Sequence, residues 1–335
     1  MGVRGDGLRQ LSRAQRVLVV LAANFAVVAV VCLLAEAGLR LMRYPFTEGS
    51  SPTENALAQF DRELGWSYLP GLSKTVQDGP AGWEVHFDAQ GIRVPSADTR
   101  LDPGRPSVLF VGGSDTMAHG LSYEESFVGQ FGALPGMPYQ VVNLGVQAYG
   151  TDQAYLALRR HLRSFNTKVV VFTFAEAQVM RNGNRDRRLL FPTARFLGTK
   201  PRFTLDGSGR LRLADRPVLY KDYFHSYLVD LVKITLGRRL GLFPPMPITL
   251  TKEIIREMAA YCAENGVRFV MVNWRWSAED YDDFGDLRLP ILDTLTDAPA
   301  DWGSRRIPGD GHPNAAAGTH VSRLLWRYFQ RAGLL

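Results

Sequence analysis

The run SVLFVGGSDT, residues 107–116, decides the fold. It begins as a short apolar stretch after Pro106 and ends in two glycines, which is typical of a buried strand that leaves a sheet through a sharp turn. A serine, Ser114, follows the glycines directly. Because loops at the carboxyl ends of parallel strands carry the chemistry of such sheets, the run predicts a serine hydroxyl that points into the crevice at that edge.

The strand pattern recurs along the chain, with helical stretches in between. Further strands are predicted at residues 139–143, 168–174 and 267–273. Helices are predicted at residues 123–133, 152–163 and 251–265, and near the C-terminus at the apolar positions Val321, Leu324, Leu325, Tyr328 and Phe329. Strand and helix in alternation predict an α/β fold, in which helices cover both faces of a parallel sheet.

Two segments depart from this alternation. Residues 60–93 contain several aromatic side chains and predict an extended, β-rich entry segment that packs on the sheet. Residues 181–245 are basic at their start and aromatic later. We expect them to form an insertion that covers one edge of the site.

The composition excludes several classes of protein. The chain has 335 residues, of which 46% are hydrophobic and 21% are charged, so it is neither disordered nor of low complexity. It has two cysteines, Cys32 and Cys262, too few for a disulfide scaffold or a cysteine-built zinc site. A net charge of +6 spread over this length does not indicate a nucleic-acid-binding protein.

Residues 17–34, VLVVLAANFAVVAVVCLL, form a stretch without a charge. Eighteen residues at helical rise span about 27 Å, close to the thickness of the hydrocarbon core. More positive charge precedes the stretch than follows it, namely Arg4, Arg9, Arg13 and Arg16 against Arg40 and Arg43. This asymmetry predicts a cytoplasmic N-terminus and an exported remainder. The alternative is a cleaved signal peptide, because Ala35-Glu36-Ala37 imitates a small-x-small cleavage site.

The length of the apolar run favours an uncleaved anchor over a signal peptide. We therefore expect a single-pass protein of the inner (cytoplasmic) membrane, with its C-terminal domain on the periplasmic or extracellular side. The predicted divisions are a cytoplasmic N-terminus at 1–16, a transmembrane anchor at 17–42, a linker at 43–59 and one globular domain at 60–335, which includes the insertion at 181–245.

A nucleophilic serine needs a histidine base and an acid that orients the histidine. Of six histidines, only His312 lies in a turn rich in helix-start signals, Asp310-Gly311-His312-Pro313-Asn314. Asp310 is close enough in sequence to bond the Nδ1 atom of His312 and leave Nε2 for Ser114. The alternative is that Asp310 and Asn314 only cap the last helix. A nucleotide-binding loop is excluded at Ser114, because neither the Walker lysine nor three spaced glycines are present.

In combination these blocks resemble the SGNH (GDSL-type) hydrolase superfamily. The matching pieces are VLFVGGSDTMAHG with Ser114, VVNLGVQAYGTDQ, and DGHPN with Asp310 and His312, and the resemblance covers residues 60–331. It is closest to membrane-anchored bacterial members that act as polysaccharide O-acetyl esterases or transferases. It implies a flavodoxin-like three-layer α/β/α fold, with Ser114 as nucleophile, His312 as base and Asp310 as the acid that orients His312.

The resemblance also implies an oxyanion hole built from the backbone N–H of Ser114, a glycine N–H of the second block and an asparagine side chain of the third. The glycine position falls on Ala148, which keeps the N–H. The asparagine position falls on Ala177, and Gln178 beside it is the candidate replacement. Losing one such donor typically lowers the rate a hundred- to a thousandfold.

These features predict a membrane-anchored, exported serine esterase that removes acyl groups such as acetyl from envelope carbohydrate or lipid. One alternative is an O-acyltransferase that uses the same triad on an exported polysaccharide. The expected partners would then include polysaccharide biosynthesis or export machinery. Another is a non-catalytic binding or scaffold protein, because the third-block asparagine is missing. No cofactor and no metal are predicted, since no histidine and acidic residue have ligand spacing on one helix.

Overall fold

The structure is a computed structural model that describes residues 12–46, 56–77, 82–192 and 194–335. The chain divides into two compact units, one of Met1–Glu48 with Phe224–Phe243 and one of Gly49–Tyr223 with Pro244–Leu335. Most of the predicted cytoplasmic N-terminus and of the predicted linker lies outside the described residues.

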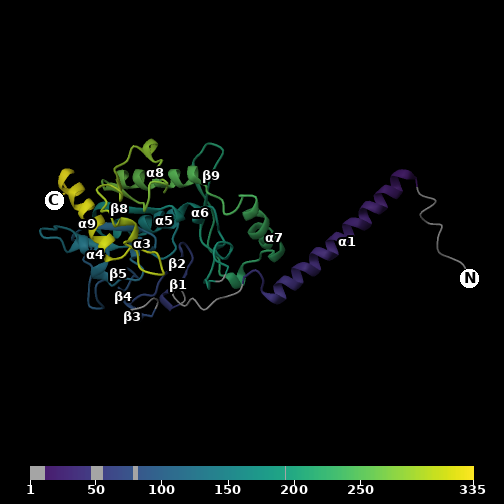
Figure 1. Ribbon diagram of the computed structural model, residues 1–335, viewed down its shortest axis with the longest axis horizontal. Helices are drawn as coiled ribbons and strands as arrows, with labels where there is room; N and C mark the ends of the chain where they lie inside the picture. Colours follow the sequence, from purple (N-terminus) through teal and green to yellow (C-terminus); the bar gives the residue numbers. More distant parts are fainter. Residues whose placement is uncertain (1–11, 47–55, 78–81, 193) are drawn as a thin grey trace, which may run out of the picture. The chain divides into compact units, whose positions relative to one another are not determined.

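The larger unit is built on an eight-stranded sheet (Figure 1), whose order is β12-β11-β8-β6-β7-β5-β4-β3. The five strands from β12 to β7 are parallel, and β5, β4 and β3 extend the sheet antiparallel. The strands are β3 (Ser73–Val76), β4 (Trp83–Phe87), β5 (Arg93–Val94), β6 (Pro106–Gly112), β7 (Gln140–Asn143), β8 (Asn166–Ala175), β11 (Arg268–Trp274) and β12 (Ile291–Asp293).

Numbered along the chain, the parallel strands lie in the order 2-1-3-4-5, which is the flavodoxin-like order. The helices of this unit are α3 (Ser114–Met117), α4 (Phe127–Gly132), α5 (Thr151–His161), α6 (Ala177–Asn182), α8 (Ile248–Glu264) and α9 (Ala315–Arg331). The predicted α/β fold with a central parallel sheet is therefore confirmed.

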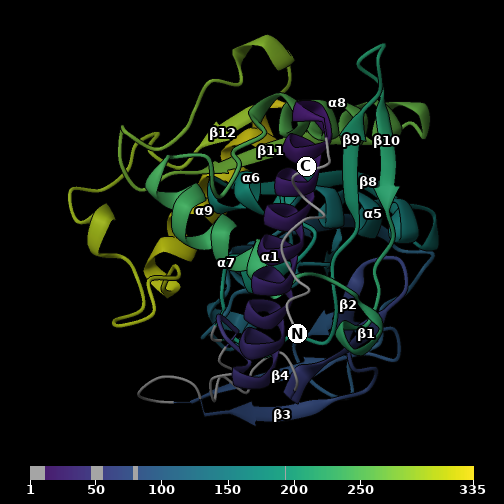
Figure 2. The same cartoon turned by 90° about the vertical axis from the view of Figure 1, so that its right-hand side faces the viewer.

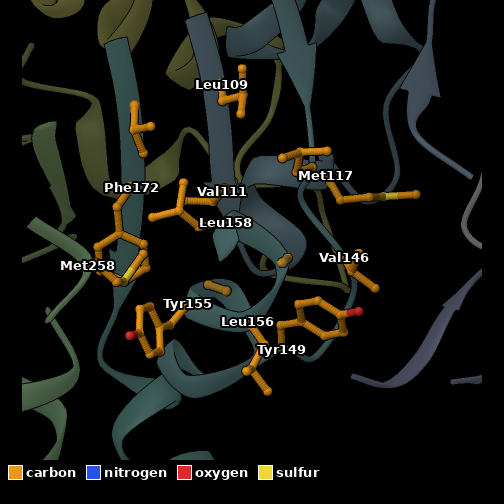
Figure 3. Packing of buried hydrophobic residues seen from close by; sticks show 14 of the residues in the cluster. Leu109, Val111, Met117, Val146, Tyr149, Tyr155, Leu156, Leu158, Phe172 and Met258 are labelled. Atoms are coloured by element: carbon orange, nitrogen blue, oxygen red, sulfur yellow. The ribbon is translucent and has the colours of Figure 1, made fainter. Parts of the chain in front are cut away.

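Side chains of β6 alternate between two hydrophobic cores, as the period of a strand requires. Leu109 and Val111 face the core that also contains Phe172 of β8 and Met258 of α8, and Figure 3 shows these side chains packed together. Val108 and Phe110 face the opposite core, which is closed by α4 and α9. Helices thus cover both faces of the sheet.

The predicted helix at residues 123–133 is divided in the structure. A 3-10 turn, η1 (Tyr123–Glu125), comes first, and α4 begins only after Ser126. The Ser126 hydroxyl accepts a hydrogen bond from the backbone N–H of Gly129 at 2.9 Å. Serine prefers this N-cap role to a helix interior, which explains the break.

The segment before β6 is β-rich, as predicted. Besides β3 to β5 it contains an antiparallel hairpin, β1 (Ala58–Asp61) and β2 (Gly65–Tyr68). Asp61 of β1 forms a bidentate ion pair with Arg160 of α5, at 2.6 and 2.9 Å. This pair fixes the hairpin to the parallel part of the fold.

Between α6 and α8 the larger unit adds a second hairpin, β9 (Arg202–Leu205) and β10 (Leu211–Asp215), which stands beside α5 and α8 in Figure 2. The ammonium of Lys200, just before β9, bonds the carboxylate of Asp152 at the start of α5, and both side chains are buried. The remaining 3-10 turns are η2 (Leu162–Ser164), η3 (Arg187–Leu189), η4 (Tyr220–Asp222), η6 (Gly285–Leu287) and η7 (Trp302–Ser304).

The smaller unit contains α1 (Arg13–Met42), α7 (Tyr227–Val232) and a π-helical turn, η5 (Lys233–Gly237), that continues α7. Helix α1 is long and apolar enough to cross a membrane, and none of its apolar window is buried. A signal sequence has the same properties, so both the anchor and the signal-peptide hypotheses are compatible with this helix.

Candidate active site

The turn that carries Ser114 depends on two glycines at the end of β6. A Cβ on Gly112 would lie 2.2 Å from Oγ1 of Thr116, so only glycine fits where α3 folds back on the strand. Gly113 is the N-cap of α3, and Ser114 is its first residue. The strand therefore delivers the Ser114 side chain, 8% exposed, at the carboxyl edge of the sheet.

Arg93 of β5 holds the other end of this turn. Its buried guanidinium donates hydrogen bonds to the carbonyls of Met117, Ala118 and Leu121, the Ala118 bond being 2.8 Å long. Burial lowers the pKa of Arg93 to about 10, so the side chain stays protonated at neutral pH. The sequence alone did not single out Arg93, because nothing in a two-residue strand predicts a contact to a turn more than twenty residues later.

Ser114, His312 and Asp310 form one hydrogen-bonded chain. The Nε2 atom of His312 lies 2.8 Å from Oγ of Ser114, and its Nδ1 atom lies 2.5 Å from Oδ1 of Asp310. The same carboxylate oxygen accepts the backbone N–H of His312 at 3.0 Å. Two loops 198 positions apart thus meet in the order that a nucleophile, a base and an orienting acid require.

The electrostatics of the pair match these roles. Burial lowers the pKa of the His312 imidazole, but the hydrogen bond to Asp310 and the charges of Asp115 and Asp310 outweigh burial, so the pKa lies above its usual value. Burial raises the pKa of Asp310, but the hydrogen bonds from His312 lower it to about 2. Asp310 is therefore ionised at neutral pH and stabilises the imidazolium that forms when His312 takes a proton.

A second histidine lies against the triad. Nε2 of His119 is 3.4 Å from Oδ2 of Asp310, and the centres of the His119 and His312 rings are 4.6 Å apart. Nδ1 of His119 contacts the amide of Gln147, and its ring packs edge-on against Trp83. In sequence His119 lies only five residues after Ser114, and the structure adds that it contacts Asp310.

Two backbone N–H groups, those of Ser114 and Ala148, are the predicted oxyanion donors. Neither the N–H of Ser114 nor that of Ala148 donates to an acceptor within the described part of the chain. Ala148 has a φ of +60°, the left-handed conformation that a glycine would adopt without strain. Its loop approaches α3 so closely that a Cβ on Gly145 would lie 2.3 Å from the N atom of Met117. The role of Ala148 stays a prediction that this geometry favours.

The carboxamide of Gln178 lies beside the nucleophile turn, since a Cβ on Gly113 would be 3.6 Å from its Nε2 atom. The amide is engaged, however. Nε2 donates to the carbonyl of Thr173 at 3.0 Å, and Oε1 accepts the hydroxyl hydrogen of Thr151 at 3.1 Å. One N–H of Gln178 is therefore committed to the end of β8, and the oxyanion role of this side chain stays a prediction.

Arg181 of α6 brings a positive charge to the same turn. Its Nη1 atom donates to the carbonyl of Tyr149 at 3.0 Å and would lie 3.6 Å from a Cβ on Gly113. Burial lowers the pKa of Arg181 to about 10, and its charge lowers the pKa of His312. The sequence placed Arg181 only at the basic start of the insertion, because no local pattern links α6 to the nucleophile.

The triad region is also where a cation could be held. Ligand atoms of His119, Asp310 and His312 lie within 4.8 Å of one another. Both ring nitrogens of His312 already have partners, Nδ1 with Asp310 and Nε2 with Ser114, so a metal bound by His312 would displace one of these two contacts.

No protein-family model matches the chain, and no curated protein matches it. Solved structures that are similar include TesA, with 14% identity, a TM-score of 0.40, and 68% of this chain and 99% of that chain covered.

Another is the psychrotrophic esterase EstA from Pseudoalteromonas sp., with 10% identity, a TM-score of 0.41 and coverage of 67% and 97%. A third is a catalytic mutant of Axe2, an acetylxylan esterase from Geobacillus stearothermophilus, with 11% identity, a TM-score of 0.36 and coverage of 68% and 95%. Lipolytic proteins of the G-D-S-L family are also among the matches. Because these identities and TM-scores are low, what this chain does has to be inferred from its own residues.

Proposed function

We propose that this protein is a serine ester hydrolase of SGNH type, anchored in the inner membrane by α1, that removes acyl groups such as acetyl from carbohydrate or lipid of the cell envelope. The observation that carries the proposal is the hydrogen-bonded chain from Ser114 through His312 to Asp310. The other elements, the anchor and the envelope substrate, are supported by the apolar helix and by the resemblance of the motifs to exported family members.

The first half of the reaction uses the geometry as it stands. Nε2 of His312 takes the hydroxyl proton while Oγ of Ser114 bonds the ester carbonyl carbon, and the carbonyl electron pair moves onto oxygen. Within the described residues the N–H groups of Ser114 and Ala148 donate to no acceptor, which supports a role for them in binding that oxygen. When the tetrahedral carbon collapses, the alcohol leaves with the proton from His312, and the acyl group remains on Ser114.

In the second half, water attacks the acyl-enzyme carbon and gives a proton to His312, which returns it to Oγ of Ser114 as the acid leaves. Asp310 stays ionised throughout and stabilises each imidazolium. If a sugar hydroxyl attacks in place of water, the same residues catalyse acyl transfer, so hydrolysis and transfer differ only in the second acceptor.

The test uses the full-length protein in detergent or nanodiscs, with a fluorophosphonate probe and a chromogenic acetyl ester. We expect the probe to label Ser114, and Ser114→Ala to lose both labelling and ester hydrolysis. Ser96→Ala is the matched control, because Ser96 is exposed and bonds only to Thr99 within its own loop. A Ser114→Ala protein with undiminished hydrolysis would refute the proposal.

The same experiment separates the two alternatives. A folded wild-type protein that the probe does not label would favour a non-catalytic binding protein, for which the engaged amide of Gln178 is the supporting observation. Labelling followed by acyl transfer to an added glycan, at the expense of free acid, would identify a transferase.

A further inference from the structure

Helix α7 is bonded through its N-terminus to the end of α1. The carboxylate of Glu36 accepts the backbone N–H groups of Tyr227 and Leu228, at 3.1 and 2.9 Å, and the hydroxyl of Ser226 at 2.9 Å. The two N–H groups are among those that a helix start leaves unpaired, so Glu36 adds to the N-cap that Ser226 of the same segment already provides.

Arg40, one turn further along α1, completes this junction. Its guanidinium bonds Glu36 at 2.6 Å and donates to the carbonyl of His225. It also lies over the rings of Phe224 and Tyr227, 5.2 and 5.0 Å from their centres. Two charged side chains of α1 therefore fix where the segment Phe224–Phe243 begins.

The junction lies just beyond the apolar run of α1. That run ends at Leu34, and Glu36 follows two residues later, about 3 Å along the axis at helical rise. In a bilayer spanned by residues 17–34, the start of α7 would therefore be at the level of the lipid headgroups.

The part of the segment after the junction carries an exposed apolar stripe. Its members recur every three or four positions and are about half exposed or more: Val229 at 50%, Val232 at 48%, Leu236 at 49% and Leu240 at 59%. Exposed cations lie among them, namely Lys233, Arg238 and Arg239. An apolar stripe beside a basic face is the pattern of helices that lie in a membrane interface.

We propose that residues 224–243, which include α7 and η5, form an interfacial membrane segment, whose apolar stripe enters the acyl boundary of the bilayer that α1 spans and whose cations bind anionic lipid phosphates. The proposal rests on the anchoring part of the proposed function. Its physical ground is the hydrogen-bonded attachment of α7 to the end of α1, together with the sign of the flanking charges.

Depth-dependent quenching tests this placement in the full-length protein, reconstituted in vesicles of phosphatidylcholine and phosphatidylglycerol. An environment-sensitive fluorophore is attached at Leu240→Cys in a Cys32→Ser background. The remaining cysteine, Cys262, does not compete for the label, because it is buried and burial raises the pKa of its thiol to about 12. Gly207→Cys on the β9–β10 turn is the water-exposed control, because an added Cβ there meets nothing within 4 Å. The native Cys32, labelled before reconstitution, reports on α1 itself.

We expect a nitroxide lipid labelled near the headgroup to quench the Leu240 label at least about threefold more than the Gly207 label, and aqueous iodide to do the reverse. If the nitroxide lipid quenches the Cys32 label but aqueous iodide quenches the Leu240 label freely, the inference is overturned and the anchor stands. A Leu240 label shielded from both quenchers would mean that protein covers the stripe, which also overturns it. If the nitroxide lipid does not quench the Cys32 label, the proposed anchor is wrong and the inference fails with it. The esterase proposal is not affected by this outcome, because ester hydrolysis is measured in a separate assay.

Discussion

Asp310→Asn removes one negative charge from the triad and leaves the shape of the side chain nearly unchanged. The asparagine oxygen can still accept from Nδ1 of His312, so the main loss is the attraction between the carboxylate and the imidazolium. At a charge separation of about 4 Å and an effective dielectric constant of about 20, that attraction is about 4 kcal/mol, or about 10³-fold in rate. Because the Asp310 side chain is 32% exposed, solvent reduces the effect, and we expect kcat/KM to fall by about 10²- to 10³-fold.

The pH profile should change in a defined direction. His312 acts as a base only when it is neutral, so activity rises with pH through its pKa, which lies above the usual value in the wild type. Burial lowers that pKa and the bond to Asp310 raises it. Asp310→Asn should therefore lower the pKa of His312 and move the acidic limb of the profile to lower pH, even as the plateau falls.

Hydrolysis of a chromogenic acetyl ester between about pH 5 and 9 measures both effects. Asp301→Asn is the matched control, because Asp301 is an exposed carboxylate of the neighbouring turn that bonds only Arg305 among side chains. We expect this control to keep the wild-type plateau and limb. The reasoning is refuted if Asp310→Asn keeps a plateau within about threefold of the wild type, or if its acidic limb moves to higher pH.

Three further substitutions test one charge beside the triad and two ion pairs elsewhere in the larger unit. Arg181→Gln removes a charge that lowers the pKa of His312, so the acidic limb of ester hydrolysis should move to higher pH, and an unmoved limb would contradict this. Lys200→Met leaves Asp152 buried without its partner and should lower the free energy of unfolding in urea by about 3–5 kcal/mol, whereas adding Asp152→Asn should restore most of it. Burial raises the pKa of Asp61, but its hydrogen bonds lower it to about 2. The ionised Asp61 therefore stabilises the folded protein above about pH 4, and this contribution is lost as the pH falls towards 2. Asp61→Asn should therefore be less stable than the wild type by about 2 kcal/mol at pH 7, with denaturation curves that converge near pH 2.

The sequence predicted the parallel sheet because its strands are continuous apolar runs. β6, β8 and β11 are buried on both faces, so each reads as an unbroken series of valine, phenylalanine and similar residues. Once these runs were assigned, the carboxyl ends of β6 and β7 had to lie at one edge, which brought Ser114 and the second block together. The exact limits of the helices were harder to predict from the sequence. Ser126, for example, ends the turn η1 and also caps the start of α4.

The groups around the triad were less predictable, because each reaches the nucleophile across the fold. Arg93 comes from the short strand β5, Arg181 from a helix after β8, and His119 from the loop after α3. No spacing or periodicity marks these contacts. They follow from strand order and from the direction of individual side chains, which only the folded chain shows.

The contact between His312 and Asp310 was easier to predict than these long-range contacts, because both residues lie in one turn. Asp310 bonds both the backbone N–H and the ring of His312, and Gly311 between them has a φ of +90°, which glycine adopts without strain. The turn therefore orients the imidazole by contacts within three residues, and the DGH sequence was enough to predict the contact between Asp310 and His312. The predicted oxyanion donor Ala148 has no such local origin: its loop approaches α3 because Gly145 has no side chain, and a Cβ there would lie 2.3 Å from the N atom of Met117. It follows that catalysis should be far more sensitive to a side chain added at Gly145 than the sequence around it would indicate.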